Sequence, residues 1–130
     1  MKQETIDQLA AADVAMAKAA FMLKGPYVDE AGRHAYYAMF HAANALIVER
    51  GFKPPKTHRG LHQLFARATQ TEPALVSLVA LLGDSYSFKW DADYGPANST
   101  ITIAEAQHAI ADATRFIATI RADLALPPAP

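Results

Sequence analysis

The sequence has no cysteine among its 130 residues, so it forms no disulfide and offers no thiolate as nucleophile or metal ligand. It also lacks a long hydrophobic run, because the longest one, from Ala74 to Gly83, is too short to cross a bilayer as a helix. The charged first segment does not resemble a signal peptide. These absences predict a soluble cytoplasmic protein that makes no contact with a membrane.

An excess of charge of either sign is also missing. Twelve Lys and Arg residues nearly balance thirteen Asp and Glu residues, so the surface as a whole does not attract a polyanion. Any contact with nucleic acid is therefore expected to be local. Hydrophobic residues make up 52% of the chain, with alanine the commonest, and this composition favours one core of closely packed helices. We expect a single domain over residues 1–130, with its core at about 3–124 and a proline-rich tail at 125–130.

Glycine and proline divide the chain into five segments with the pattern of a helix. We predict helices from Gln3 to Leu23, from Asp29 to Arg50, from His58 to about Thr69, from Pro73 to Trp90, and from Thr102 to the residues before Pro127. After Trp90 the chain is expected to loosen as far as Pro96. Because no strand pattern stands out, the predicted fold class is all-α, an antiparallel up-and-down four-helix bundle with an additional short helix.

Local signals predict how these helices begin, end and pack. Thr57 is expected to cap the third helix, Thr102 and Glu105 to form a capping box, and Gly51 to close the second helix. In the first helix the expected buried face consists of Ile6, Leu9, Ala10, Asp13, Ala17, Ala20 and Phe21. In the fourth helix it consists of Leu75, Leu78, Val79, Leu82 and Tyr86.

The second helix carries two stripes of side chains at helical spacing. One stripe, which we predict to be core, consists of Tyr36, Met39, Phe40 and Ala43. The other stripe is polar and consists of His34, Tyr37, His41 and Asn44. Spacing alone leaves two interpretations of the polar stripe, either the wall of a functional cleft or the hydrated edge of a helix interface.

Four short motifs follow one another along the chain. They are Tyr36-Tyr37-Ala38-Met39-Phe40-His41-Ala42-Ala43, Gly51-Phe52, Lys56-Thr57-His58 and Ala92-Asp93-Tyr94-Gly95. In this order, over about residues 10 to 120, the chain resembles the small stand-alone prokaryotic members of the HEPN superfamily. The resemblance implies an all-α bundle, a homodimer without a cofactor, and a toxin-antitoxin or defence setting with a minimal nucleotidyltransferase as the antitoxin partner. Many such relatives are metal-independent ribonucleases, whereas others only bind.

Catalytic relatives carry an arginine followed, after four to six intervening residues, by a histidine. The nearest pairs in this chain do not have that spacing, since seven residues separate Arg33 from His41 and Arg50 from His58, and two separate Arg59 from His62. The resemblance therefore does not by itself imply catalysis here.

Metal-free cleavage of RNA needs a base for the 2′-hydroxyl, an acid for the leaving oxygen and a cation for the phosphorane. We take His41, His58 and Arg59 as the candidate catalytic residues. The alternative for His41 is an interface histidine that donates to a carbonyl. His58 and Arg59 stand at a helix N-terminus that favours an anion, and the alternative for them is a solvated basic turn.

The candidates for binding a nucleotide or RNA are polar residues of the same motifs: Arg33, His34, Tyr37, Asn44, Lys89, Asp93 and Tyr94. Tyr37 and Asn44 could orient a base or ribose, although a bundle tyrosine also packs with its hydroxyl at the rim. Lys89 stands where close relatives have arginine, so it can hold phosphate only as a point charge. Asp93 could pair with Arg33 or Arg59. Asp91 and Asp93 could together ligate a metal ion, but the sequence offers no third ligand beside them, so we expect no metal site.

Three functional hypotheses remain. In the first, a homodimer binds a nucleotide or RNA segment without cutting it, in a cleft lined by Arg33, Tyr37, His41 and His58-Arg59. In the second, the same cleft is a metal-independent endoribonuclease with His41 or His58 as the base. In the third, the domain contacts a protein partner and binds no nucleotide. The missing motif spacing favours the first.

Overall fold

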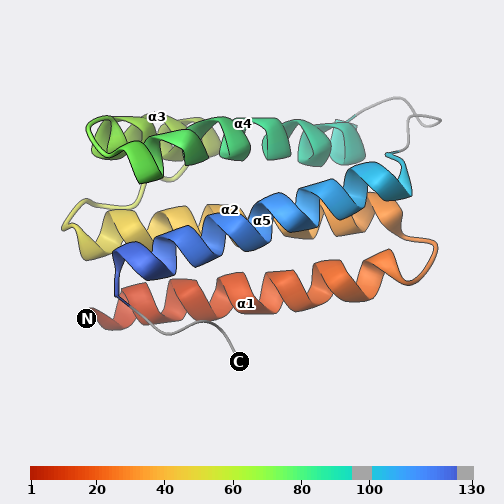
Figure 1. The fold of residues 1–130 in the computed structure, drawn as a ribbon, viewed down its shortest axis with the longest axis horizontal. Coiled ribbons are helices and arrows are strands. Elements are labelled where there is room, and N and C mark those ends of the chain that lie inside the picture. The colour runs from red at the N-terminus through yellow and green to blue at the C-terminus, as the bar shows by residue number, and fades with distance from the viewer. Residues whose placement is uncertain (95–100, 126–130) are drawn as a thin grey trace.

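The computed structural model describes residues 1–94 and 101–125, apart from the side chains of Phe88 and of residues 90–94. The described ranges contain five helices and no strand, namely α1 (Gln3–Leu23), α2 (Val28–Glu49), α3 (His58–Thr69), α4 (Pro73–Tyr94) and α5 (Ile103–Asp123) (Figure 1). The predicted all-α fold class is confirmed. Within the described residues, none of the helices combines the length and the hydropathy that a membrane span requires.

The second helix is the centre of the bundle. In the view of Figure 1, α3 and α4 lie above α2 and α1 lies below it, and α2 contacts each of the other four helices. The buried side of α2 includes many small residues. Five alanines are fully buried there: Ala35, Ala38, Ala42, Ala43 and Ala45. Small side chains let neighbouring helices approach closely, so this sequence can pack on several sides at once.

The predicted signals at the helix ends are confirmed. The side chain of Thr57 accepts a hydrogen bond from the backbone N–H of Gly60 at 2.9 Å and caps α3. Thr102 and Glu105 form the reciprocal capping box at the start of α5, with distances of 2.9 and 3.0 Å. Gly51 has a φ of 88°, in the left-handed region, and follows the end of α2.

The fourth helix is longer than predicted. Its buried face is confirmed, with Leu75, Leu78 and Leu82 inside the core and Val79 and Tyr86 packed against it. The expected loosening after Trp90 is wrong for residues 91–94, because α4 continues to Tyr94. None of these four residues is a helix breaker, and the first glycine and proline come only at positions 95 and 96.

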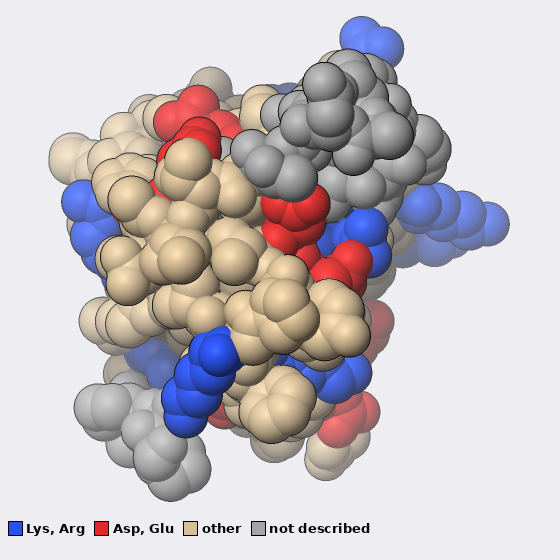
Figure 2. Space-filling view, turned by 90° about the vertical axis from the view of Figure 1, so that its right-hand side faces the viewer, with Lys and Arg blue, Asp and Glu red and all other residues tan. Residues whose placement is uncertain are grey.

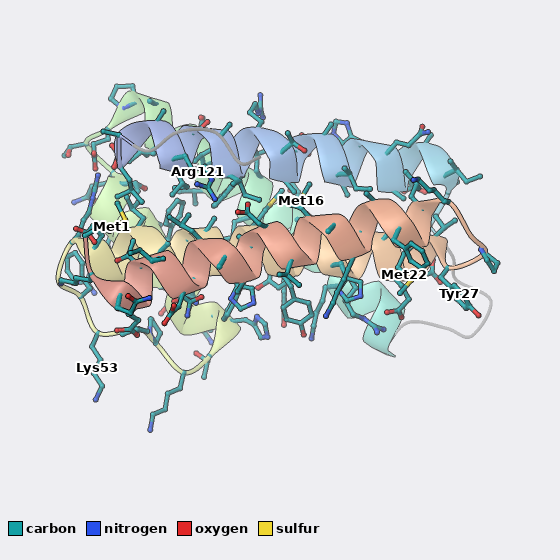
Figure 3. All side chains as sticks on the ribbon, turned by 90° about the horizontal axis from the view of Figure 1, so that it is seen from below. Met1, Met16, Met22, Tyr27, Lys53 and Arg121 are labelled. Carbon is teal, nitrogen blue, oxygen red and sulfur yellow. The ribbon has the colours of Figure 1, made fainter. Side chains whose placement is uncertain are left out.

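The expected buried face of α1 is wrong for most of its residues. Ile6 and Phe21 are 45% and 73% exposed, and only Leu9 of that predicted set is fully within the core. Instead α1 buries Thr5, Leu9, Ala12, Ala15 and Ala19. On the side toward α5, Arg121 pairs with Asp13 at 2.7 Å, and Figure 3 shows Met16 and Arg121 between the two helices. The helix is turned so that small side chains meet α2, which brings the two backbones close.

One arginine holds the end of α2 to three other segments. Arg50 binds the carboxylate of Glu72 through two nitrogens, at 2.5 and 2.6 Å, and donates to the carbonyl of Ala68 at 2.9 Å. A third contact reaches Asp123 of α5 at 3.3 Å. The hydrogen bonds from Arg50 hold the pKa of Glu72 below its ordinary value. The α3–α4 turn and the end of α5 are thereby fixed against the central helix.

Candidate functional site

A hollow of about 400 Å³ lies between α1 and α2, and we call it the α1–α2 hollow. From α1 it is lined by Ala11, Val14, Ala15 and Lys18, and from α2 by His34, Tyr37 and His41. Three of the four residues of the predicted polar stripe therefore share one face. The volume falls within the range of sites that hold small molecules.

His41 is both an interface histidine and a wall of the hollow. Its Nδ1 lies 2.8 Å from Oε1 of Gln8 on α1. Because an amide oxygen only accepts, this contact places the proton on Nδ1 and leaves the lone pair on Nε2. Burial lowers the pKa of His41 below its ordinary value of 6.5, so the ring is neutral at pH 7. His41 can therefore accept a proton or a hydrogen bond through Nε2.

The other polar residues of the hollow differ in charge. Burial lowers the pKa of His34, an effect that the nearby Glu30 partly opposes and Lys18 reinforces. At neutral pH the hollow thus combines the ammonium group of Lys18 with two uncharged imidazoles and the phenol of Tyr37. A cation beside neutral donors and acceptors can hold a phosphate and the polar edge of a base at the same time.

A second group of rings continues from the hollow toward α3 and α4, and we call it the Tyr36 cluster: Tyr36, His58, His62 and Tyr86. The hydroxyl of Tyr36 lies 2.8 Å from Nδ1 of His58 and 3.1 Å from Nε2 of His62. Burial raises the pKa of Tyr36, so the hydroxyl keeps its proton and donates to one imidazole while it accepts from the other. The cluster adjoins the hollow, because the rings of Tyr37 and His58 lie 6.2 Å apart.

The Tyr36 cluster was only partly predicted from the sequence. Tyr36 is fully buried, as expected for a core residue, but its polar role was missed. His62 was missed as well, and burial together with the charge of His58 lowers its pKa. The available signal was the spacing of His58 and His62, which places two imidazoles four residues apart on one face of α3.

The remaining predicted site residues lie outside the hollow. Arg33 pairs with Glu30 at 2.7 Å, and Arg59 is exposed on α3. Lys89 is only 7% exposed, with its amino group 5.9 Å from the centre of the Tyr86 ring. Asn44 is 4% exposed and faces the bundle interior, where its Oδ1 has no hydrogen-bond partner among the described residues. Asn44 therefore does not line the α1–α2 hollow.

The side chains of Asp91, Asp93 and Tyr94 lie outside the described part of the structure, and so does the expected pairing of Asp93 with Arg33 or Arg59. Elsewhere in the chain, no group of three or more His, Asp or Glu side chains in the described ranges is placed to hold a metal ion.

One end of the bundle shows how charge is distributed. Figure 2 views the end where α1 stops and α2 begins, and uncharged residues cover much of it. Lys and Arg are scattered among Asp and Glu there, and the described residues of this face form no continuous basic surface. A phosphate would therefore depend on local contacts, such as the one that Lys18 offers.

Comparison with known proteins identifies the family of this chain. The model of the HEPN domain matches residues 7–123, a range that includes the hollow and the Tyr36 cluster. A protein of Methanocaldococcus jannaschii named "Putative toxin MJ0605" is 32% identical over 96 residues, which cover 73% of this chain and 69% of that protein. The chain therefore belongs to the HEPN domain family.

Proposed function

We propose that this chain is a toxin-antitoxin or defence-associated member of the HEPN family that binds a nucleotide or RNA segment in the α1–α2 hollow and acts as a homodimer. The observation that carries the proposal is the convergence of Lys18, His34, Tyr37 and His41 on one hollow. Family membership and the name of the Methanocaldococcus jannaschii protein support the toxin-antitoxin setting. In that setting, a minimal nucleotidyltransferase would be the antitoxin partner.

Three of the lining residues have distinct roles in the proposed complex. The ammonium group of Lys18 contacts a phosphate oxygen, and Nε2 of His41 accepts a hydrogen bond from a 2′-hydroxyl or an exocyclic amine. The ring of Tyr37 offers a face or an edge to a base. Because His34 and His41 are neutral at pH 7, the charge of the hollow comes from Lys18, and binding depends only modestly on salt.

A second candidate function is metal-independent cleavage of RNA. The observation that favours it is the neutral imidazole of His41, whose Nδ1 is held by Gln8 while Nε2 is left to take a proton. In this reaction His41 would remove the proton of a 2′-hydroxyl, whose oxygen bonds to phosphorus while the P–O5′ bond breaks and the departing oxygen takes a proton from water. A cation such as Lys18 would stabilise the phosphorane. This candidate uses the same bound segment as the first, so one set of variants tests both.

The test is a titration of a fluorescein-labelled single-stranded RNA with purified protein in EDTA, followed by fluorescence anisotropy. Lys18→Ala should weaken binding about tenfold, because it removes the charged contact. Lys53→Ala is the matched control, since Lys53 is exposed and projects from the α2–α3 connection away from the bundle (Figure 3). No binding by the wild type, or an equal loss in both variants, would contradict the proposal.

The same samples decide between binding and cleavage. After incubation with total RNA in EDTA, a gel shows whether the wild type produces fragments that His41→Ala and Lys18→Ala do not. Cleavage that both variants lose establishes a metal-free ribonuclease. Intact RNA with retained binding establishes the non-cutting function. Circular dichroism of each variant confirms that it is folded.

A further inference from the structure

The outer face of α1 carries an exposed apolar stripe, which we call the α1 stripe. It consists of Ile6, Ala10, Val14, Ala17 and Phe21, and its three large members are 45%, 55% and 73% exposed in that order. Figure 1 shows α1 at the lower edge of the bundle, with no other described helix on its far side. Single exposed hydrophobic residues are common on proteins, but five at helical spacing form a continuous face that favours a partner.

Four residues of the α1 stripe are placed symmetrically about a midpoint between Asp13 and Val14, and the fifth, Val14, lies directly beside that midpoint. Ile6 and Phe21 lie equally far from that point on either side, and so do Ala10 and Ala17. A two-fold axis through the midpoint pairs each residue with the one equally far on the other side of an antiparallel copy. Ile6 of one copy then meets Phe21 of the other. Ala10 meets Ala17, and these small residues let the two helices approach closely.

Charged residues on one flank of the stripe fit the same arrangement. Asp7 and Lys18 are exposed and eleven residues apart, so at 100° per residue they point within about 20° of each other. In the antiparallel pair, the residue directly opposite Asp7 is at position 20 of the other copy. Lys18 of that copy is two positions away, about 3 Å along the helix. The antiparallel pair thus forms two symmetric ion pairs, whereas a parallel two-fold pair would place the charged flanks of the two copies on opposite sides of the interface.

We propose that the α1 stripe docks a second copy of this chain in this antiparallel register, which places Asp7 of that copy at the rim of the α1–α2 hollow. The inference rests on the homodimer of the proposed function and specifies its interface. Val14 and Lys18 border both the stripe and the hollow, so the second copy forms the outer wall of the hollow. The hollow is complete only in the dimer, and a bound phosphate competes with Asp7 for Lys18.

The first test measures the oligomeric state by sedimentation velocity without RNA, so its outcome is separate from that of the RNA titration. The wild type should sediment as a dimer of the 14.1 kDa chain. Val14→Glu should weaken the dimer at least about tenfold, because it buries a charge at the centre of the interface. Val76→Glu on α4 is the matched control, since Val76 is 42% exposed and lies off the stripe.

The second test reverses the two charges. Asp7→Lys and Lys18→Asp should each weaken the dimer, and the double variant should restore it, because the ion pair is rebuilt with opposite polarity. Glu4→Lys makes the same change of charge at another exposed residue of α1. It should leave the dimer unchanged, because Glu4 has no such partner in this register.

Three results would overturn the proposal. They are a monomeric wild type, a dimer that Val76→Glu weakens and Val14→Glu does not, and a monomer whose stripe variants instead lose a copurifying nucleotidyltransferase. The last result would assign the stripe to that partner.

Discussion

The hydroxyl of Tyr36 lies 2.8 Å from Nδ1 of His58 and thereby joins the central helix to the start of α3. The two residues belong to different motifs, Tyr36-Tyr37 on α2 and Lys56-Thr57-His58 before and at the start of α3. Their contact gives a physical reason for both motifs in this chain. A buried hydroxyl needs a hydrogen-bond partner, and the imidazole ring of His58 supplies it beside the α1–α2 hollow.

Removing this hydroxyl should destabilise the protein. Tyr36→Phe leaves the ring in place but strips the contacts to His58 and His62, and we expect a loss of about 1–3 kcal/mol in the free energy of unfolding. Urea denaturation measures it. Tyr37→Phe removes a hydroxyl from the rim of the hollow and should cost less than about 0.5 kcal/mol. Equal losses in the two variants would show that the Tyr36 contacts do not contribute.

Arg50 should be the most sensitive of the surface arginines. Arg50→Ala removes the paired contacts to Glu72 and the bond to the Ala68 carbonyl, and should lower the free energy of unfolding by about 1–3 kcal/mol. Arg50→Lys should recover only part of it, because an ammonium group cannot bind a carboxylate through two nitrogens in one plane. Thermal denaturation checks both, with Arg59→Ala as the exposed control. A full recovery by lysine would contradict the role of paired geometry.

Stability should fall in mild acid because of the buried histidines. Burial lowers the pKa of His34, His41 and His62 below 6.5, so the unfolded chain takes up protons more readily than the folded one. Their contribution is complete above pH 6.5 and is lost as the pH falls through the lower folded values. The melting temperature at pH 7.5 and 5.5 measures the loss. The double variant His41→Gln/His62→Gln should lose less between these pH values than the wild type does.

RNA binding should respond to pH in the opposite direction. Protonation of His34 and His41 adds positive charge to the hollow, so affinity should rise several-fold between pH 7.5 and 5.5. Anisotropy titrations at low temperature, where the protein stays folded, follow the change. In His41→Gln the rise should be smaller, and an affinity that is flat or falls with acid in the wild type would argue against phosphate binding in the hollow.

The sequence predicted the ends of the helices better than the directions of their faces. Thr57, Gly51 and Thr102 act on the backbone beside them, so their effects need no knowledge of the rest of the fold. The face of α1 was mispredicted because alanine occurs all round that helix. Two apolar faces were available, and the close approach to α2 selected the one with the smaller side chains.

Only part of the polar stripe of α2 lines the α1–α2 hollow. Helical spacing groups Asn44 with His34, Tyr37 and His41, but every residue from 42 to 48 is buried. Neighbouring helices surround α2 there, so the stripe leaves the surface after His41. Where a neighbour begins to cover a helix depends on tertiary packing, which spacing along one helix does not contain. The contribution of Lys18 from α1 could not be predicted for the same reason.

The most direct test of the central claim is an NMR titration that follows the imidazole resonances as a short single-stranded RNA is added in EDTA. His34 and His41 line the hollow, whereas His108 is exposed on α5, with a side chain that is 73% exposed. The account predicts that the resonances of His34 and His41 shift progressively to saturation while that of His108 stays in place, and that Lys18→Ala raises the RNA concentration required. A shift of His108 without one of His34 and His41, or no change at any histidine, would contradict it.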